Sequence, residues 1–177
     1  MKEHGQRKHK ETIMISKKLE KAINAQINRE LYSSYLYLAM ANAAEAAVLK
    51  GTASWFKIQA AEENAHAMKF YAYLHEQGAK VELEAIGKPP ADFASMQAMF
   101  EQTLKHEKLV TKYIRDLMVM ADAEKDYASM GLIQWFVNEQ IEEEANVVEI
   151  LAQLKMIGGS TGGLFMLDKQ LGKRAAG

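Results

Sequence analysis

Cysteine is absent from this chain of 177 residues, and proline is nearly so. The missing cysteine excludes disulfide bonds, thiolate metal sites and cysteine nucleophiles, and it is compatible with a reducing compartment. The two prolines are the adjacent Pro89 and Pro90, and they lie in a stretch, residues 79–94, that cannot form one helix. Any helical arrangement must therefore contain one long break there.

The net charge of the chain is close to zero, and no part of the sequence is unusually apolar. The 22 basic and 23 acidic residues leave a formal net charge of −1, which predicts no nucleic-acid partner and no anionic membrane partner. No stretch approaches the roughly 18 uninterrupted apolar residues of a membrane helix. The basic residues 1–12 also lack the apolar core of a secretory signal. A cytoplasmic protein is the expectation.

The length and the hydrophobic content of 49% suit one domain with a substantial core and are short for two domains. Residues 1–13 have no helical periodicity, so we expect a disordered N-terminal extension there and a single folded domain over residues 14–177. Within that domain, apolar periodicity marks four long segments.

Each of these segments carries a seam, a row of residues at alternating steps of three and four, which predicts an amphipathic helix. Polar residues of the kind that bind metals interrupt each apolar seam near its middle. The seams are Ile23, Ile27, Glu30, Ser34, Tyr37 and Ala41; Phe56, Gln59, Glu63, His66, Phe70 and Tyr73; Phe100, Thr103, Glu107, Val110, Ile114 and Leu117; and Ile133, Phe136, Gln140, Glu143, Val147, Ile150 and Leu154.

Capping residues and glycines mark the expected helix ends. The long link over residues 79–94 lets the third helix start at the far end of the bundle and run parallel to the second. A fifth segment, residues 161–171, is apolar but too short for a core of its own, so we expect it to pack between subunits. The expected helices are 16–43, 52–78, 92 or 95 to about 122, 126–156 and 161–171.

The polar positions repeat at constant spacing. The interval from Glu30 to Glu63 is identical to the interval from Glu107 to Gln140. A single shift along the chain lays Glu30 on Glu107, Glu63 on Gln140 and His66 on Glu143. This pattern predicts a duplicated helical hairpin with an acidic cluster at its centre.

Such a cluster needs a countercharge, because an unpaired carboxylate in a packed core costs several kcal/mol or takes up a proton. No lysine or arginine lies on the seams near these positions. The four carboxylates of Glu30, Glu63, Glu107 and Glu143 would balance two divalent metal ions. Glu63 and His66 lie three residues apart and share a helix face. Oxygen ligands with one imidazole favour iron or manganese over structural zinc or calcium.

At these residues the chain resembles the ferritins, specifically the haem-free prokaryotic ferritins, from about Ile15 to the C-terminal region. The general di-iron bundle site has a Glu-x-x-His pair on two of its helices, and this chain departs from it with Gln140 and Glu143 at the second pair. The motifs that carry the resemblance are Asn28-Arg29-Glu30-Leu31-Tyr32 with Tyr37, Glu62-Glu63-Asn64-Ala65-His66-Ala67-Met68, the single Glu107, and Gln134-Trp135-Phe136-Val137-Asn138-Glu139-Gln140 with Glu142 and Glu143.

The resemblance implies an all-α, ferritin-like four-helix bundle with a long crossover between helices 2 and 3 and a short fifth helix. It also implies a hollow homo-oligomeric shell, usually of twenty-four chains. Its ferroxidase centre would oxidise Fe(II) to Fe(III) with O2 or H2O2, and the shell would store the ferric product as a mineral.

The resemblance also assigns ligands for two iron ions per chain and for a third, outer ion. A second site without an imidazole should hold its iron more weakly. One ion would be held by Glu30, Glu63 and His66, the second by Glu63, Glu107 and Glu143 with Gln140 beside it, and the outer ion by Glu62, Glu139 and Glu142.

Other members of the wider group fit less well. Bacterioferritins carry a second Glu-x-x-His pair and a haem-ligating methionine where this chain has Asn64, so no haem is predicted. Rubrerythrin-like peroxidases add a cysteine-ligated iron domain, which this chain cannot form. A di-iron oxidase or peroxidase without mineral storage remains the alternative enzyme, and a helical scaffold with solvated acids is the non-enzymatic alternative.

Two aromatic residues have open roles. Tyr37 lies seven residues after Glu30 on the same helix face, where its hydroxyl could hydrogen-bond a ligand or supply an electron, or its ring could fill the core. Trp135 lies four residues before Glu139 and could donate electrons or simply pack.

Overall fold

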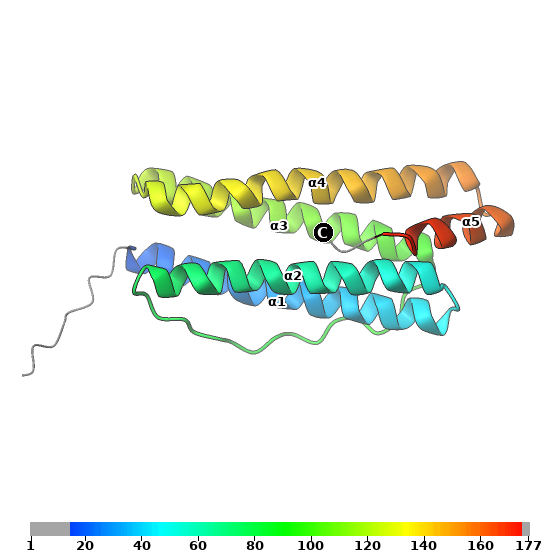
Figure 1. Cartoon of the computed structure of the whole chain (residues 1–177), viewed down its shortest axis with the longest axis horizontal. Helices are drawn as coiled ribbons and strands as arrows, with labels where there is room; N and C mark the ends of the chain where they lie inside the picture. The colour runs from blue at the N-terminus through cyan, green and yellow to red at the C-terminus, as the bar shows by residue number, and fades with distance from the viewer. Residues whose placement is uncertain (1–14, 175–177) are drawn as a thin grey trace, which may run out of the picture.

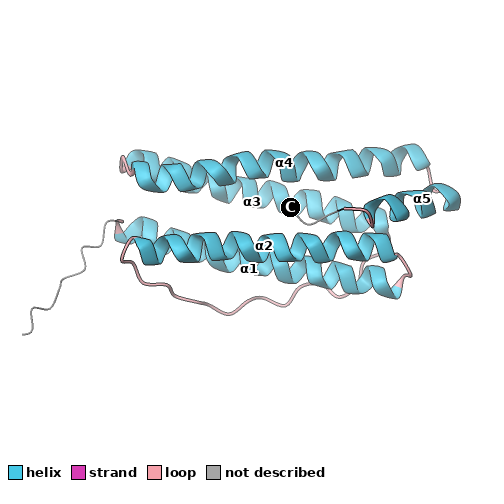
Figure 2. Cartoon of the chain, in the orientation of Figure 1, coloured by secondary structure: helices cyan, strands magenta, loops and turns pink. Residues whose placement is uncertain are grey.

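The computed structural model describes residues 15–174, and within that range it contains helices and loops but no strand (Figure 2). Four long helices form a bundle, and a short fifth lies at one end (Figure 1). The predicted all-α, ferritin-like bundle is therefore confirmed, whereas the predicted extension over residues 1–13 lies outside the described residues. The helices are α1 (Lys17–Ala46), α2 (Lys50–Glu76), α3 (Met96–Ala123), α4 (Tyr127–Ile157) and α5 (Thr161–Leu171).

Side-chain caps start most of these helices. The hydroxyl of Ser16 caps α1, that of Ser95 caps α3, and the carboxylate of Asp126 caps α4, each accepting a hydrogen bond from a backbone N–H of the first turn. Of the two candidate starts for the third helix, Ser95 is therefore the correct one. The first helix continues to Ala46, slightly beyond its predicted end.

The crossover between α2 and α3 runs along the whole bundle beside α1, so α3 starts where α2 started and the two helices are parallel (Figure 1). Asn24 of α1 ties the crossover down, because its side chain donates to the carbonyl oxygen of Lys80 at 2.9 Å and accepts from the N–H of Glu82 at 2.7 Å. Asn28, one turn later, donates to the same loop. The predicted direction of the third helix is confirmed.

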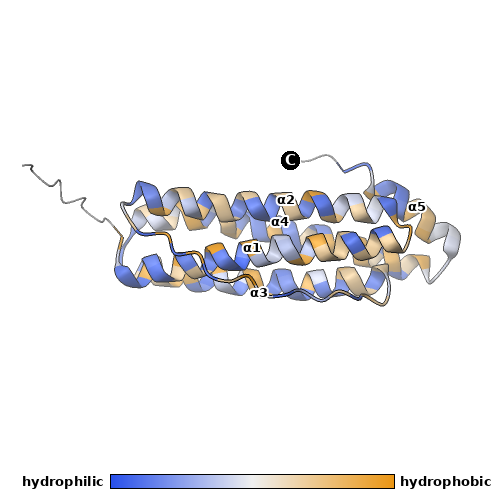
Figure 3. Ribbon diagram, turned by 90° about the horizontal axis from the view of Figure 1, so that it is seen from below, coloured by the Kyte–Doolittle hydropathy of each residue, from blue (hydrophilic) through white to orange (hydrophobic). Residues whose placement is uncertain are grey.

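The bundle core consists of two apolar clusters with the polar cluster between them. One surrounds the stacked rings of Phe56 and Phe100, and the other those of Phe70 and Phe136, with centroids 5.1 Å and 4.0 Å apart. Every residue of the four predicted seams is buried except Ser34, which is partly buried. No long helix is uniformly hydrophobic (Figure 3), and none in residues 15–174 is apolar and long enough to cross a membrane.

Asp168 of α5 caps the start of α2. Its carboxylate accepts from the N–H groups of Gly51 and Thr52 at 3.1 and 2.7 Å and from the Thr52 hydroxyl at 2.8 Å. The local N-cap residue, Leu49, offers no side-chain hydrogen bond. Gly51 permits this close approach, since a Cβ there would lie 1.6 Å from the backbone oxygen of Asp168. The cap is therefore tertiary.

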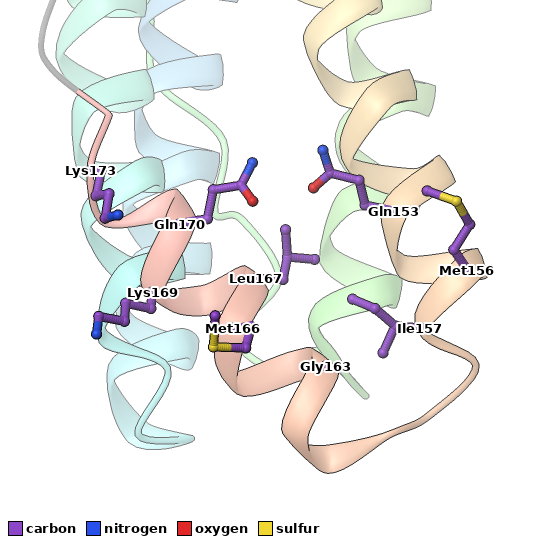
Figure 4. Close-up of a pocket in the computed structure, with 9 residues that line it drawn as sticks. All are labelled: Gln153, Met156, Ile157, Gly163, Met166, Leu167, Lys169, Gln170 and Lys173. Atoms are coloured by element: carbon purple, nitrogen blue, oxygen red, sulfur yellow. The ribbon is translucent and has the colours of Figure 1, made fainter.

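The fifth helix has two different faces. Leu167 and Leu171 are buried against the bundle, whereas Phe165 and Met166 are 68% and 65% exposed. A groove of about 740 Å³ separates α5 from the end of α4, with Ile157 and Leu167 on its walls (Figure 4). The chain thus satisfies part of the burial need of α5 itself, and packing between subunits stays a prediction.

We expect Asp168→Ala to loosen α5 by removing the cap on α2, at a cost of about 1 kcal/mol, the usual loss for a capping side chain. Hydrogen exchange should accelerate over residues 161–171 while α1, α3 and the middle of α4 stay protected. Asp116→Ala is the matched control, because Asp116 forms an exposed pair with Lys112. Equal exchange in both variants would contradict this account of α5.

Candidate metal centre

Four buried glutamates, one from each long helix, lie at the middle of the bundle. The exposed fractions of Glu30, Glu63, Glu107 and Glu143 are 1%, 2%, 1% and 4%. His66, one turn after Glu63, is 5% exposed. The structure therefore buries all five of these predicted ligands at one level of the bundle, between its two apolar clusters.

Two groups within this centre have the spacing that a metal ion requires. Ligand atoms of Glu30, Glu63 and His66 all lie within 4.8 Å of one another, and so do those of His66, Glu139 and Glu143. His66 belongs to both groups because its ring nitrogens face different carboxylates. Nδ1 lies 3.3 Å from Glu63 Oε2, and Nε2 lies 3.8 Å from Glu139 Oε1.

Neutral donors satisfy most of the carboxylate oxygens. Tyr37 donates its hydroxyl hydrogen to Glu107 Oε1. Gln140 Nε2 lies 3.1 Å from Glu107 Oε2, so the amide predicted to lie beside the second metal hydrogen-bonds one of that metal's candidate ligands. On the other helices, Gln26 donates to Glu30 Oε1 at 2.7 Å.

One fully buried oxygen of the centre has no hydrogen-bond partner among residues 15–174. Glu30 Oε2 is buried and has no hydrogen-bond partner among the described residues. Buried polar atoms are nearly always satisfied, so an unsatisfied oxygen on a carboxylate grouped with Glu63 and His66 indicates a missing donor or cation. Oxygen donors with one imidazole suit a divalent transition metal. The residues therefore fit metal ions.

The acidity of these groups leads to the same conclusion. Burial raises the pKa of Glu30 to about 8, with a further contribution from the charge of Glu63. Burial is also the main cause that raises the pKa of Glu107 and of Glu143 to about 7. The pKa of Glu63 is raised well above its ordinary value by burial and then by Glu107 and Glu143. Without a cation, protons must neutralise part of the cluster.

The three candidate ligands of an outer ion are placed differently from one another. Glu139 is partly buried and reaches His66, as described above. Glu62 is also partly buried, but its carboxylate is paired with Arg174. Glu142 is exposed. The structure thus brings one of the three to the centre and holds another in an ion pair.

Gln26 and Gln59 were not predicted to act at the centre. Gln59 donates to Glu143 Oε2 at 2.7 Å, as Gln26 does to Glu30. A signal was present, because each glutamine lies one helical turn before a cluster glutamate, and the two are separated by the same interval as Glu30 and Glu63. Arg174 gave no such signal, since it follows α5 and lies far along the chain from its partners.

Trp135 lies at the edge of the centre. Its ring centroid is 5.4 Å from that of His66, and the Lys69 ammonium lies 3.9 Å from the centroid of the indole. Trp135 is 37% exposed. The ring packs against the imidazole, and a role in electron donation stays a prediction.

Fold and site together define a class, the helical bundles that carry a buried carboxylate and histidine cluster between four long helices. Residues 20–157 match the ferritin-like domain family. The chain belongs to the ferritin family, and this membership supports a role in iron storage.

Several relatives align over nearly their whole length. A probable bacterial non-heme ferritin-like protein of Haemophilus influenzae is 40% identical over 159 residues, 90% of this chain and 96% of that protein. A bacterial non-heme ferritin of Staphylococcus aureus is 37% identical over 161 residues, 91% and 97% of the two chains. The open pore ferritin of Archaeoglobus fulgidus superposes with a TM-score of 0.90 at 44% identity, covering 91% of this chain and 99% of that chain.

The raised pKa values predict how the stability of the metal-free protein depends on pH. The folded pKa of Glu30 is about 8 against an ordinary value of 4.5, so the folded chain binds more protons than the unfolded chain above pH 4.5. The stability that these protons provide is complete below about pH 4.5 and is lost as the pH rises toward about 8.

The melting temperature of metal-free protein should therefore fall between pH 5 and pH 8, and Glu30→Gln should flatten the slope. Glu149→Gln, at an exposed position of α4, serves as the control. A melting temperature that rises over this range in metal-free protein would contradict the assignment.

Proposed function

We propose that this chain is an iron-storage ferritin with a ferroxidase centre. It oxidises Fe(II) to Fe(III) with O2 or H2O2 and stores the ferric product as a mineral inside a hollow shell of identical chains. The observation that carries the proposal is the cluster of four buried glutamates. Within residues 15–174, Glu30 Oε2 has no partner, and no lysine or arginine pairs with any of the four carboxylates.

In this proposal each chain binds two iron ions as substrate. Glu30, Glu63 and His66 hold one ion, and Glu63, Glu107 and Glu143 hold the other. Glu63 is the shared ligand, which is supported by the effect of Glu107 and Glu143 on its pKa and by its proximity to His66. Two Fe(II) supply two electrons, enough to reduce O2 to H2O2 or H2O2 to water with protons from solvent.

The surrounding residues set the charge of the site. Anionic oxygen ligands stabilise Fe(III) more than Fe(II), which lowers the cost of oxidation. Binding iron also displaces the protons that neutralise Glu30, Glu107 and Glu143 in the metal-free chain. Metal uptake should therefore be favoured as the pH rises.

The proposed site of the second iron ion has an amide and a phenol as neutral neighbours, whereas the site of the first has an imidazole. Gln140 donates to Glu107 and also lies 3.2 Å from the Thr111 hydroxyl, so its amide is held by the protein. An iron ion without an imidazole ligand should bind more weakly there. A weakly held product suits a centre that passes Fe(III) on to a mineral.

The outer acids would receive that iron. Glu139, with its contact to His66, supports a path from the centre toward Glu62 and Glu142 on the α2 and α4 surface. The exposed apolar side chains of α5, Phe165 and Met166, support burial between chains. We propose a homo-oligomeric shell of twenty-four chains.

The proposal is tested by anaerobic Fe(II) titration of metal-free protein followed by an oxygen pulse. Wild type should bind about two tight Fe(II) per chain, oxidise them rapidly and then accumulate mineral in a large particle. Glu107→Ala should slow the initial oxidation by on the order of 100-fold, because it removes a ligand of one ion and the acceptor of Tyr37.

Glu149→Gln should match wild type in these assays, since Glu149 is exposed on α4 away from the cluster. Two bound irons without mineral would favour a di-iron oxidase. No stoichiometric iron would favour a helical scaffold and end the ferroxidase proposal.

Tyr37→Phe tests whether the hydroxyl matters or the ring merely fills the core. It keeps the ring but removes the hydrogen bond to Glu107. We expect unchanged Fe(II) stoichiometry and oxidation slower by about threefold to tenfold, as for other residues that orient metal ligands. Tyr73→Phe is the matched control, because it removes a buried hydroxyl that contacts Ser129 instead. Equal rates in the two variants would leave Tyr37 with a packing role.

A further inference from the structure

Arg174, which follows α5, returns to the side of α2. Its Nη1 donates to Gln59 Oε1 at 2.7 Å, and its Nη2 donates to the carboxylate of Glu62. The guanidinium carbon lies 4.7 Å from the ring centroid of Trp55. These three partners lie on successive turns of one α2 face, so the guanidinium fork spans that face beside the metal centre.

The contact with Gln59 reaches the centre itself. Gln59 is 1% exposed, and its Nε2 donates to Glu143 Oε2 at 2.7 Å and lies 3.4 Å from Glu63 Oε1. A guanidinium can only donate hydrogen bonds. The amide oxygen of Gln59 must therefore face Arg174, and its NH2 group must face the two carboxylates. Arg174 thus sets the orientation of a side chain that hydrogen-bonds a candidate metal ligand.

The contact with Glu62 involves one of the outer acids. Arg174 and Glu62 are both partly buried, with side chains 22% and 25% exposed. Arg174 and Trp55 also line an open groove of about 350 Å³ between α2, α4 and α5. Ions in solution can therefore reach the pair, but the Glu62 carboxylate already forms an ion pair with the guanidinium of Arg174. A metal ion that takes Glu62 as a ligand must compete with the guanidinium.

We propose that Arg174 is a positioning residue that occupies the carboxylate of Glu62. Through this contact the C-terminal segment weakens divalent-cation binding to the outer acids, Glu62, Glu139 and Glu142. The Arg174 contact is released when a cation binds there. This inference rests on the proposed function, because it concerns the outer face of the same centre. Binding is reciprocal, so a cation at Glu62 must loosen the Arg174 contact by the same factor by which Arg174 weakens the cation.

The test is calorimetric titration of metal-free, assembled protein with Zn²⁺, which is redox-inert and binds oxygen and nitrogen ligands. Arg174→Gln should tighten the weakest Zn²⁺ site by about threefold to tenfold, in keeping with the modest strength of a partly exposed ion pair. Lys173→Gln removes the same charge from the exposed neighbouring residue, which lines both grooves (Figure 4) but forms no ion pair with Glu62 in the described part of the chain. It should leave that site unchanged.

A double-mutant comparison isolates Glu62 from general charge effects. In a Glu62→Gln background, Arg174→Gln should change Zn²⁺ affinity no more than Lys173→Gln does. An effect that persists in that background would overturn the proposal, and so would equal affinities for Arg174→Gln and Lys173→Gln in the otherwise unchanged chain. Arg174→Lys provides a second variant, because a single ammonium cannot hold Gln59 and Glu62 together. It should shift affinity in the same direction by a smaller factor.

Fluorescence follows the Arg174 contact directly. The chain has two tryptophans, so Trp135→Phe leaves Trp55, beneath the guanidinium, as the single indole. Saturating Zn²⁺ should shift its emission toward that of metal-free Arg174→Gln in the same background, and an unchanged spectrum would count against release. Loss of the tight Zn²⁺ sites in wild type would refute the proposed function itself, whereas intact tight sites without an Arg174 effect would refute this inference alone.

Discussion

The structure depends on one constraint, the burial of four carboxylates in the core between four helices. Such a cluster is stable only when protons or metal ions offset its charge, because desolvation strongly penalises like charges in close contact. Among the described residues the cluster has neutral donors, Gln26, Gln59, Tyr37 and Gln140, and no lysine or arginine partner. The donors orient the carboxylates without replacing the cation. Without a cation, the folded chain therefore needs protons to offset the charge of the cluster.

The surrounding architecture brings these groups to one level of the bundle. Stacked phenylalanines pack the core on both sides of the cluster, which excludes water from it. The crossover, held on α1 by Asn24, makes α3 parallel to α2 and so places the two helical hairpins against each other with their glutamates aligned. At the other end, Asp168 and Arg174 tie the end of the described chain to α2. The start of α2 and the carboxylate of Glu62 thus depend on residues from the distant C-terminal part of the chain.

Periodicity and capping chemistry made most of the fold predictable. The steps of three and four located the four seams, and Ser16 located the start of the first helix, whereas the start of the third was left open between Asp92 and Ser95. Spacing brought the five principal candidate ligands together, because helical pitch converts sequence intervals into shared faces. The glutamines one turn before Glu30 and Glu63 carried the same spacing signal but were not assigned a role. The start of α2 was less predictable, since it depends on a tertiary contact, the Asp168 cap, from a distant part of the chain.

The amino-acid sequence by itself determined the helical class, the direction of the crossover and the level of the bundle at which Glu30, Glu63, His66, Glu107 and Glu143 meet. The helical class and the level follow from local periodicity, which operates over a few turns, and the direction of the crossover follows from the length of the link over residues 79–94. Only the tertiary structure decided which acids share His66, that Glu62 pairs with Arg174, and that Gln59 hydrogen-bonds Glu143. Each of those contacts joins segments far apart in the chain, and their geometry depends on how the helices pack and where the C-terminal segment turns back, which no local pattern encodes.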